Sequence, residues 1–466
     1  MDMRCTLAAV AFATLLAGCT ASPTKQTPAA TVSTVAGVTN AQLTPDYWIS
    51  HAQQANRLVM DPAAIAAQNA KLARLDRSVI DVEHLPSTLT ADVVRKWVTD
   101  LSSRPDRALY DAEGHELSSA AVDDLVASAN STSIPLSQET HYGLVVRRAD
   151  LRTFPTRLRV FSSQGDTDID RFQESALFPG TPVAIVHVSE DGKWWFVVSP
   201  LYAAWIEKDA VADGDAAQVF GYTHKVPYLI VTGAKARTVF TPERPEISDL
   251  QLDMGVRVPV MNDWPADKPV NGQHPYTGHV IELPYRTDDG SLRFSPALLP
   301  RTADVANDYL PLTHATLLQQ SFKFLGERYG WGHSYNARDC SGFVSDVYRS
   351  FGVQLPRNTR DQGVSPALNR IAFSDADTHD TRIAALRQLQ VGDLIYIPGH
   401  VMMVIGHEGG TPYIIHDTVG VSYRDASGDV TRARLNGVSV TPLVPLLLGN
   451  DQPLIDRIYS IQRIRP

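Results

Sequence analysis

The spacing of apolar residues changes character along the chain. Residues 63–75 and 91–101 carry apolar or alanine positions at three- and four-residue spacing, which predicts helices. From about residue 142 the apolar runs become short, β-branched and aromatic, which predicts strands. Helical spacing returns over residues 314–328 and again after residue 340, before a further group of strands. The pattern therefore predicts an α+β protein with several modules.

The predicted modules follow these changes of pattern. At 466 residues the chain is too long for a single hydrophobic core. We expect a signal peptide at 1–18, a flexible tether at 19–45, a mostly helical module at 46–135, small β-barrels at 136–215 and 216–302, and a C-terminal domain at 303–466.

The N-terminus predicts export. Arg4 precedes an apolar stretch at residues 7–16, which is too short to span a bilayer and typical of a secretory signal. The stretch ends in Leu16-Ala17-Gly18-Cys19, which resembles the bacterial lipobox, in which Cys19 is lipid-modified and anchors the protein to a membrane. Thr20 resembles the outer-membrane sorting pattern, which implies a periplasmic lipoprotein of the cell envelope. The alternative is a plain signal peptide with a chance cysteine.

The charge of the chain argues against one class of partner, and its cysteine content draws attention to one thiol. A net charge of -9 without any Lys/Arg-rich run argues against a nucleic-acid partner. Of the three cysteines, Cys5 leaves with the signal and Cys19 carries lipid, so the mature chain, expected to be a monomer, keeps Cys340 as a free thiol. In an oxidising compartment a single thiol is either buried as a small hydrophobe or used chemically.

The neighbours of Cys340 favour chemistry. Phe343, Val344, Val347 and Tyr348 recur at helical spacing, which places Cys340 at or near the start of a helix. Unpaired amide N–H groups and the helix dipole at such a position favour a thiolate over a thiol.

A base and an orienting group are predicted downstream. A strand, a tight turn and a second strand put His400 at the opening of the second strand. In a third strand, at 413–417, alternation places His416 and Asp417 on opposite faces, and antiparallel pairing can set His416 beside His400. Asp417 stays open as the alternative orienting group, and His333 as the rival base. The His and Cys spacings match no zinc pattern, so neither a metal nor a cofactor is expected.

These residues resemble the NlpC family of papain-like murein endopeptidases. The motifs that carry the resemblance are Tyr329-Gly330-Trp331-Gly332, Arg338-Asp339-Cys340-Ser341-Gly342-Phe343, Leu355-Pro356-Arg357-Asn358, Gly392-Asp393-Leu394, Gly399-His400-Val401 and Ile415-His416. The segment 147–156, with residues 194–198 and 204–206, resembles the first bacterial SH3-like domain of such enzymes. The resemblance implies a papain-like cysteine peptidase domain behind two SH3-like barrels.

The resemblance also implies roles for the site residues. Cys340 is the nucleophile, His400 the base, and His416 the residue that orients it. Asp339 and Ser341 match positions that contact the free amino group and backbone of a stem peptide. Thr359 stands where relatives often carry a substrate-contacting serine, and Tyr329 lies near the cleft.

The implied reaction is hydrolysis of the γ-D-Glu–diamino acid amide in peptidoglycan stem peptides that have a free N-terminal L-Ala. The first barrel, through the segment 147–156 and the aromatic residues 194–196, is expected to close one end of the cleft. Asp339 is then expected to be an unpaired carboxylate that meets the substrate ammonium. Two alternatives stay open: amidase or acyl-transfer chemistry at the same thiol, and an inert wall-binding lipoprotein.

Overall fold

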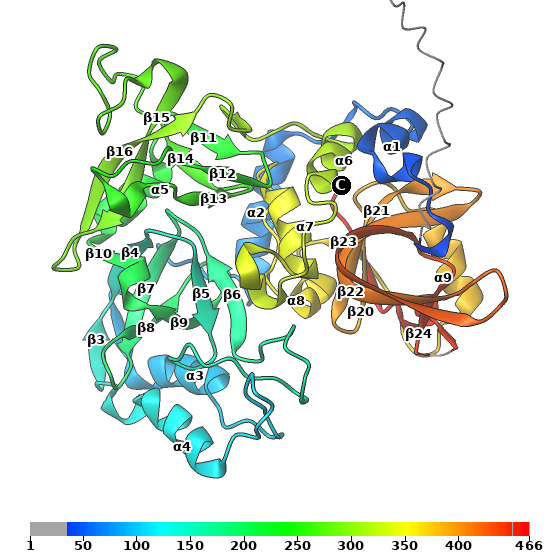
Figure 1. Ribbon diagram of the computed structural model, residues 1–466, viewed down its shortest axis with the longest axis horizontal. Helices are drawn as coiled ribbons and strands as arrows, with labels where there is room; N and C mark the ends of the chain where they lie inside the picture. The colour runs from blue at the N-terminus through cyan, green and yellow to red at the C-terminus, as the bar shows by residue number, and fades with distance from the viewer. Residues whose placement is uncertain (1–34, 450, 466) are drawn as a thin grey trace, which may run out of the picture. The chain divides into compact units, whose positions relative to one another are not determined.

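The computed structural model describes residues 35–449 and 451–465 (Figure 1). Its α-helices are α1 (Pro45–His51), α2 (Pro62–Leu75), α3 (Ala91–Leu101), α4 (Ser119–Ser128), α5 (Ala216–His224), α6 (His314–Phe322), α7 (Cys340–Arg349), α8 (Thr359–Val364) and α9 (His379–Leu386). Within these residues no helix has the length and apolar content needed to span a membrane. The predicted signal peptide and Cys19 lie outside the described residues.

In the described part of the chain, one antiparallel seven-stranded sheet covers much of the first predicted barrel. Its strands are β4 (His141–Val145), β5 (Ala149–Arg152), β6 (Gln173–Leu177), β7 (Pro182–Val188), β8 (Trp194–Val198), β9 (Ala203–Glu207) and β10 (Val211–Gly214), in the order β10-β4-β7-β8-β9-β5-β6. The predicted turn at Asp191-Gly192 joins β7 to β8, with Gly192 at φ 69°. Leu144, Phe196 and Trp205 are fully buried inside this sheet.

A second group of strands follows and shares its own core. The strands are β11 (Tyr228–Val231), β12 (Lys235–Arg237), β13 (Gln251–Asp253), β14 (Arg257–Pro259), β15 (Gly278–Arg286), β16 (Leu292–Pro300) and β17 (Val305–Ala306). They pair as β14-β11-β17, β12-β13 and β15-β16, and Leu229, Leu252 and Ile281 lie in the core between them. Its interpretation as a second SH3-like barrel stays a proposal.

The C-terminal domain is built on an eight-stranded sheet of the described residues, whose long strands are strongly curled in Figure 1. The strands are β19 (Asn369–Ala372), β20 (Leu394–Ile397), β21 (His400–Glu408), β22 (Thr411–Arg424), β23 (Val430–Pro442), β24 (Leu446–Leu448), β25 (Gln452–Pro453) and β26 (Ser460–Arg463). Met403 and Ile415 share a core with Phe343 of α7, whereas Met402 and Ile414 lie in a second core. Helix α7 therefore packs on one face of this sheet, and the fold is mixed α and β with a papain-like C-terminal domain.

Residues 38–65 contribute side chains to the core of the C-terminal domain. Strand β1 (Leu58–Met60) pairs with β18 (Leu312–Thr313), and Trp48 of α1 lies in the core that also holds α7. Val38 and Gln42 are buried as well, so the prediction of a tether that extends to residue 45 is wrong at its C-terminal end. The reason is local packing: the Trp48 indole N–H donates to the Gln42 carbonyl at 2.8 Å.

Later residues of the predicted helical module pack elsewhere. Val94 and Val98 of α3 share a core with Leu144 and Trp205 of the first barrel. Strands β2 (Thr88–Thr90) and β3 (Ser137–Glu139) also pair across the expected boundary at residue 135. The predicted module boundaries at residues 135, 215 and 302 therefore stay predictions.

Helix α6 ends earlier than its apolar spacing predicts. It begins after a capping box at Thr313 and stops at Phe322 instead of continuing to residue 328. Gly326 adopts φ +82°, and its N–H donates to the Val438 carbonyl at 2.9 Å. Pairing with β23 thus takes backbone groups that a longer helix would need.

Candidate active site

Cys340 is the first residue of α7, as its sequence context predicts. Asp339 precedes it as the N-cap, and its Oδ1 accepts the Gly342 N–H at 2.7 Å. A Cβ at position 342 would lie 2.5 Å from Cε1 of His333, so only glycine fits there. The cap and this close approach fix the start of the helix and hence the position of the thiol.

The Cys340 thiol lies in a closed gap between three elements. Its sulfur is 3.5 Å from the Thr359 hydroxyl at the start of α8, and it accepts the backbone N–H of Val401 at the start of β21. Cys340 is only 4% exposed. Val401 directly follows His400, so the predicted nucleophile lies at the end of the sheet where β21 begins with the predicted base.

The structure places His400 and His416 in contact. Nε2 of His400 lies 2.9 Å from Nδ1 of His416, whose Nε2 in turn lies 3.1 Å from the Thr441 hydroxyl. His416 is 1% exposed. The Nε2 edge of His400 is therefore engaged by His416, and Nδ1 is the ring nitrogen outside this contact. The alternation of β22 therefore brings the predicted base and the predicted orienting residue together on one face of the sheet.

Asp417, the alternative orienting residue, lies on the other face of β22. Its side chain is fully buried, and within the described part of the chain neither carboxyl oxygen has a hydrogen-bond partner. Burial, together with the charges of Asp339 and Glu327, raises the pKa of Asp417 well above its usual range. The group in contact with His400 is His416.

Asp417 makes stability depend on pH. The folded state keeps this carboxyl neutral, whereas the unfolded chain ionises it above about pH 4. The contribution of Asp417 to the free energy of unfolding is therefore fully present below that pH. It is lost as the pH rises towards the raised pKa of Asp417 in the folded state. We expect thermal unfolding midpoints of the wild type to fall more steeply between pH 5 and pH 8 than those of Asp417→Asn. Parallel curves for the two proteins would contradict this assignment.

Burial shifts the pKa values of both Cys340 and His400. It raises the pKa of the Cys340 thiol to about 12, and the negative charge of Asp339 adds to the effect. Burial also lowers the pKa of His400 to about 4. Burial thus favours the neutral forms of both groups, against the resting thiolate that the helix start predicts. The Asp339 carboxylate that caps the first turn of α7 acts in the same direction on the thiol.

Asp339 is paired with a buried arginine. Arg357 approaches Oδ2 of Asp339 at 2.8 Å and also donates to the Ser341 hydroxyl at 3.0 Å. Arg357 also donates to the hydroxyl of Ser175 on β6 of the first barrel at 2.6 Å. The prediction that Asp339 is an unpaired carboxylate is therefore wrong. Arg357 stands in the Leu-Pro-Arg-Asn motif, but sequence reasoning gave it no role.

Comparison with known proteins identifies the domain that carries this arrangement. The family model described as NlpC/P60 family matches residues 326–440, which include the residues at positions 340, 400 and 416. The chain carries an NlpC/P60 domain. A second model, described as SH3 domain (SH3b1 type), matches residues 159–207 of the first barrel. NlpC/P60 proteins are cysteine peptidases that act on peptidoglycan.

Individual relatives agree with this assignment. A gamma-D-glutamyl-L-lysine dipeptidyl-peptidase of Bacillus cereus is 27% identical over 201 residues, which are 41% of this chain and 50% of that protein. The chain thus spans about half the length of this curated relative. The solved structure of an NlpC/P60 endopeptidase from Photobacterium damselae subsp. piscicida matches with a TM-score of 0.69 at 17% identity, over 90% of this chain and 96% of that one. That likeness shows a shared fold over most of the chain.

Two residues of the first barrel join the NlpC/P60 site, and sequence reasoning missed both. Glu174 on β6 accepts hydrogen bonds from the Thr153 hydroxyl at 2.5 Å and from the Tyr202 hydroxyl. Among the described residues, Glu174 forms no ion pair, although its neighbour Ser175 contacts Arg357. Burial, followed by the charge of Glu174, raises the pKa of Tyr202, which keeps its hydroxyl a donor. No local motif marks these residues, because β6 reaches the site only in the folded chain.

The aromatic residues expected to close the cleft have a different place. Trp194 and Phe196 are buried in the core of the first barrel, and Lys208 lies over the ring of Trp195. The prediction that they wall off the cleft is therefore wrong. Alternation along β8 turns the first and third side chains inwards, so the strand supports the barrel and not the site.

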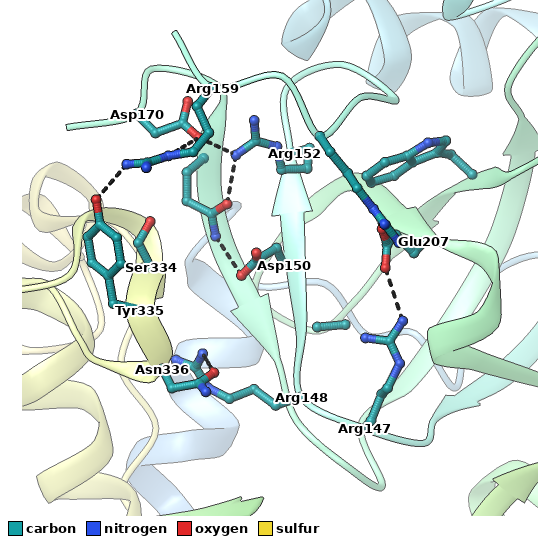
Figure 2. A pocket seen from close by; sticks show the side chains of 14 residues that line it. Arg147, Arg148, Asp150, Arg152, Arg159, Asp170, Glu207, Ser334, Tyr335 and Asn336 are labelled. Carbon is teal, nitrogen blue, oxygen red and sulfur yellow. Dashed lines mark hydrogen bonds and ion pairs between the residues drawn. The ribbon is translucent and has the colours of Figure 1, made fainter. Parts of the chain in front are cut away.

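The predicted segment 147–156 does reach the NlpC/P60 domain. Figure 2 shows Arg148 of this segment beside Asn336, to which it donates at 2.9 Å. Nearby, Gln173 donates to the Gly332 carbonyl at 2.8 Å, and the Gly332 N–H donates to Asp339 at 3.1 Å. A cavity of about 410 Å³ lies at this junction. The first barrel thus holds the loop that leads to the N-cap of α7.

The remaining predicted residues are also accounted for. His333, the rival base, is 3% exposed and packs between Gly342 and Phe178, and burial lowers its pKa well below the usual range. Tyr329 is buried, and its pKa is raised by burial and then by Cys340, which places its ring near the thiol. Within residues 35–449 and 451–465, no cluster of three or more His, Cys, Asp or Glu side chains is arranged to hold a metal ion.

Proposed function

We propose that this protein is a cysteine peptidase that hydrolyses peptide stems of peptidoglycan. The observation that carries the proposal is the contact of His400 with His416 at the strand end that also meets the Cys340 sulfur, inside an NlpC/P60 domain. A thiol, an imidazole and a second polar group in this order are the components of papain-like acyl transfer.

In the proposed mechanism the Cys340 thiol and the His400 imidazole start in the neutral forms that burial favours, and this sets the order of the proton transfers. His400 takes the proton of the Cys340 thiol as the sulfur attacks the substrate carbonyl, and His416 keeps the imidazole in position. Backbone N–H groups at the start of α7 stabilise the oxyanion. His400 then gives the proton to the leaving amine, and water hydrolyses the thioester to release the acid and the free thiol.

The bond proposed for cleavage is the γ-D-Glu–diamino acid amide of a stem with a free N-terminal L-Ala. The name of the Bacillus cereus relative supports the γ-D-glutamyl linkage. Glu174 supports the free terminus, because it is a carboxylate without an ion-pair partner in the described part of the chain, beside the Arg357–Asp339 pair. With Asp339 already neutralised by Arg357, Glu174 is the group that we expect to meet the ammonium.

The proposed setting is the cell envelope. The lipobox-like sequence at residues 16–19 supports attachment to a membrane through Cys19, and Thr20 supports the periplasmic face of an outer membrane. In this setting the protein acts as a monomer on stem peptides, with no cofactor.

The deciding experiment is mass spectrometry of defined stem peptides after digestion. Cleavage between γ-D-Glu and the diamino acid is expected to release L-Ala-γ-D-Glu together with the shortened remainder. Loss of ammonia alone, or a product with an added amine in place of water, would replace the peptidase by an amidase or an acyl-transfer enzyme. Intact peptides would leave the chain without the proposed activity.

The two histidines are expected to differ in importance. His400→Ala removes the group that moves the proton, whereas His416→Ala removes only its support, so the second variant should retain on the order of 100-fold more kcat. Thr441→Val, which loses the hydroxyl that contacts His416, should retain a still higher kcat. Steady-state rates on one peptide measure all three. Equal losses for His400→Ala and His416→Ala would show that both residues take part in proton transfer.

A further inference from the structure

A second cavity, of about 830 Å³, lies away from the thiol and shares none of the site residues described above. Its walls come from the end of α1 and the loop after it, β1, the start of α6, the segment between α9 and β20, β21, and the C-terminal residues. We call it the cationic cavity, because the charged side chains that line it, all from the described residues, are three arginines, Arg57, Arg387 and Arg465; three histidines, His51, His314 and His407, line it as well.

No carboxylate of the described residues lines the cationic cavity. Arg465 is paired with Asp393, which is fully buried behind it. Arg57 and Arg387 are exposed, and within the described part of the chain neither forms an ion pair. Two guanidinium charges therefore face the cavity without compensation, in a chain whose net charge is -9.

The neutral polar groups of the cavity are also rich in hydrogen-bond donors. They are the side chains of Gln53, Gln54, Gln388 and Gln390. Arginine can only donate, and its planar fork binds two oxygens of one phosphate or carboxylate at once. The complement of such a lining is an anion with several oxygen atoms. A volume of this size also accommodates an organic body attached to that anion.

The walls are held in place before any ligand binds. The Ala315 N–H donates to the Ala55 carbonyl at 2.9 Å, which ties the loop after α1 to α6. Nε2 of His407 lies 3.1 Å from the Leu386 carbonyl, and Nδ1 of His51 lies 2.6 Å from the Tyr47 carbonyl. A site assembled from distant parts of the chain thus needs little ordering when it is filled.

We propose that the cationic cavity binds an organic phosphate, in which the phosphate group meets Arg57 and Arg387 and the glycerol or sugar body meets the glutamines. Free phosphate esters and lipid headgroups share this chemistry. The site acts independently of the thiol, so its occupation does not depend on the proposed peptidase activity.

The test uses the full protein and two probes. Glycerol 3-phosphate is titrated by calorimetry at low salt, and flotation compares vesicles of phosphatidylglycerol with vesicles of phosphatidylcholine. Arg57→Gln/Arg387→Gln should weaken binding of the accepted probe at least about tenfold, because two charge-assisted contacts are lost. The matched control Arg74→Gln/Arg77→Gln, with the same charge change at exposed residues of and just after α2, should stay within about twofold.

Peptide hydrolysis by both double variants checks folding, since neither pair touches the candidate active site. Binding of glycerol 3-phosphate identifies a soluble ester as the ligand, and selective flotation with phosphatidylglycerol identifies a headgroup; either result supports the proposal. Failure of the wild type to bind both probes would overturn it. Equal weakening in the two double variants would also overturn it, because the effect would then follow net charge and not this cavity.

Discussion

Cys340→Ala is expected to lower the rate of stem-peptide hydrolysis by at least about 10⁴-fold, because the variant lacks the atom that forms the thioester. Its thermal midpoint should stay close to that of the wild type. The thiol contributes a long contact to Thr359 and accepts the Val401 N–H, while the start of α7 is held by Asp339 and Gly342. Rates on a defined peptide and thermal unfolding curves measure the two effects separately.

The matched control is Ser341→Ala, which changes the adjacent hydroxyl on the same helix turn. It loses a hydrogen bond from Arg357 but no reacting atom, so it should retain far more activity than Cys340→Ala. A Cys340→Ala protein that still cleaves at the wild-type rate would show that another nucleophile performs the reaction. Ser341 would then be the first candidate.

Much of the site was predictable because its signals are local. The start of α7 follows from the spacing of Phe343 and Val347 after Cys340, and the structure begins the helix at that residue. The contact between His400 and His416 follows from strand alternation across antiparallel strands, which fixes which residues share a face. Turn signals such as Asp191-Gly192 likewise mark a real hairpin.

The rest depends on contacts between residues far apart in the sequence. Arg357 neutralises Asp339 only because α7, the segment before α8 and β6 converge, so the charge state of Asp339 had no local signal. The early end of α6 has the same origin, since β23 competes for its backbone groups. Protonation states also cannot be predicted from the sequence pattern, because they depend on burial in the folded chain. The pKa of Cys340, which burial raises, is an example.

The free-terminus requirement is the second large effect that we expect. A peptide L-Ala-γ-D-Glu-diamino acid should be cleaved with a kcat/KM roughly 100-fold higher than the same peptide with its amine acetylated. The reason is that the ammonium gives Glu174 the charge partner that it lacks among the described residues, whereas an acetyl group leaves a carboxylate desolvated and unpaired. Competition between the two peptides in one reaction, followed by mass spectrometry, measures the ratio directly.

Glu174→Gln should reduce this ratio to about tenfold or less, mainly by slowing cleavage of the free-amine peptide, since a neutral amide no longer attracts the ammonium. Glu190→Gln makes the same charge change at an exposed position of the same barrel and should leave the ratio unchanged. Asp339→Asn should behave differently from both. Asp339 pairs with Arg357 and caps α7, so this substitution should slow cleavage of both peptides alike and lower the thermal midpoint. If Asp339→Asn removes the preference while Glu174→Gln preserves it, the ammonium is bound at the helix cap and the barrel only supports the loop before it.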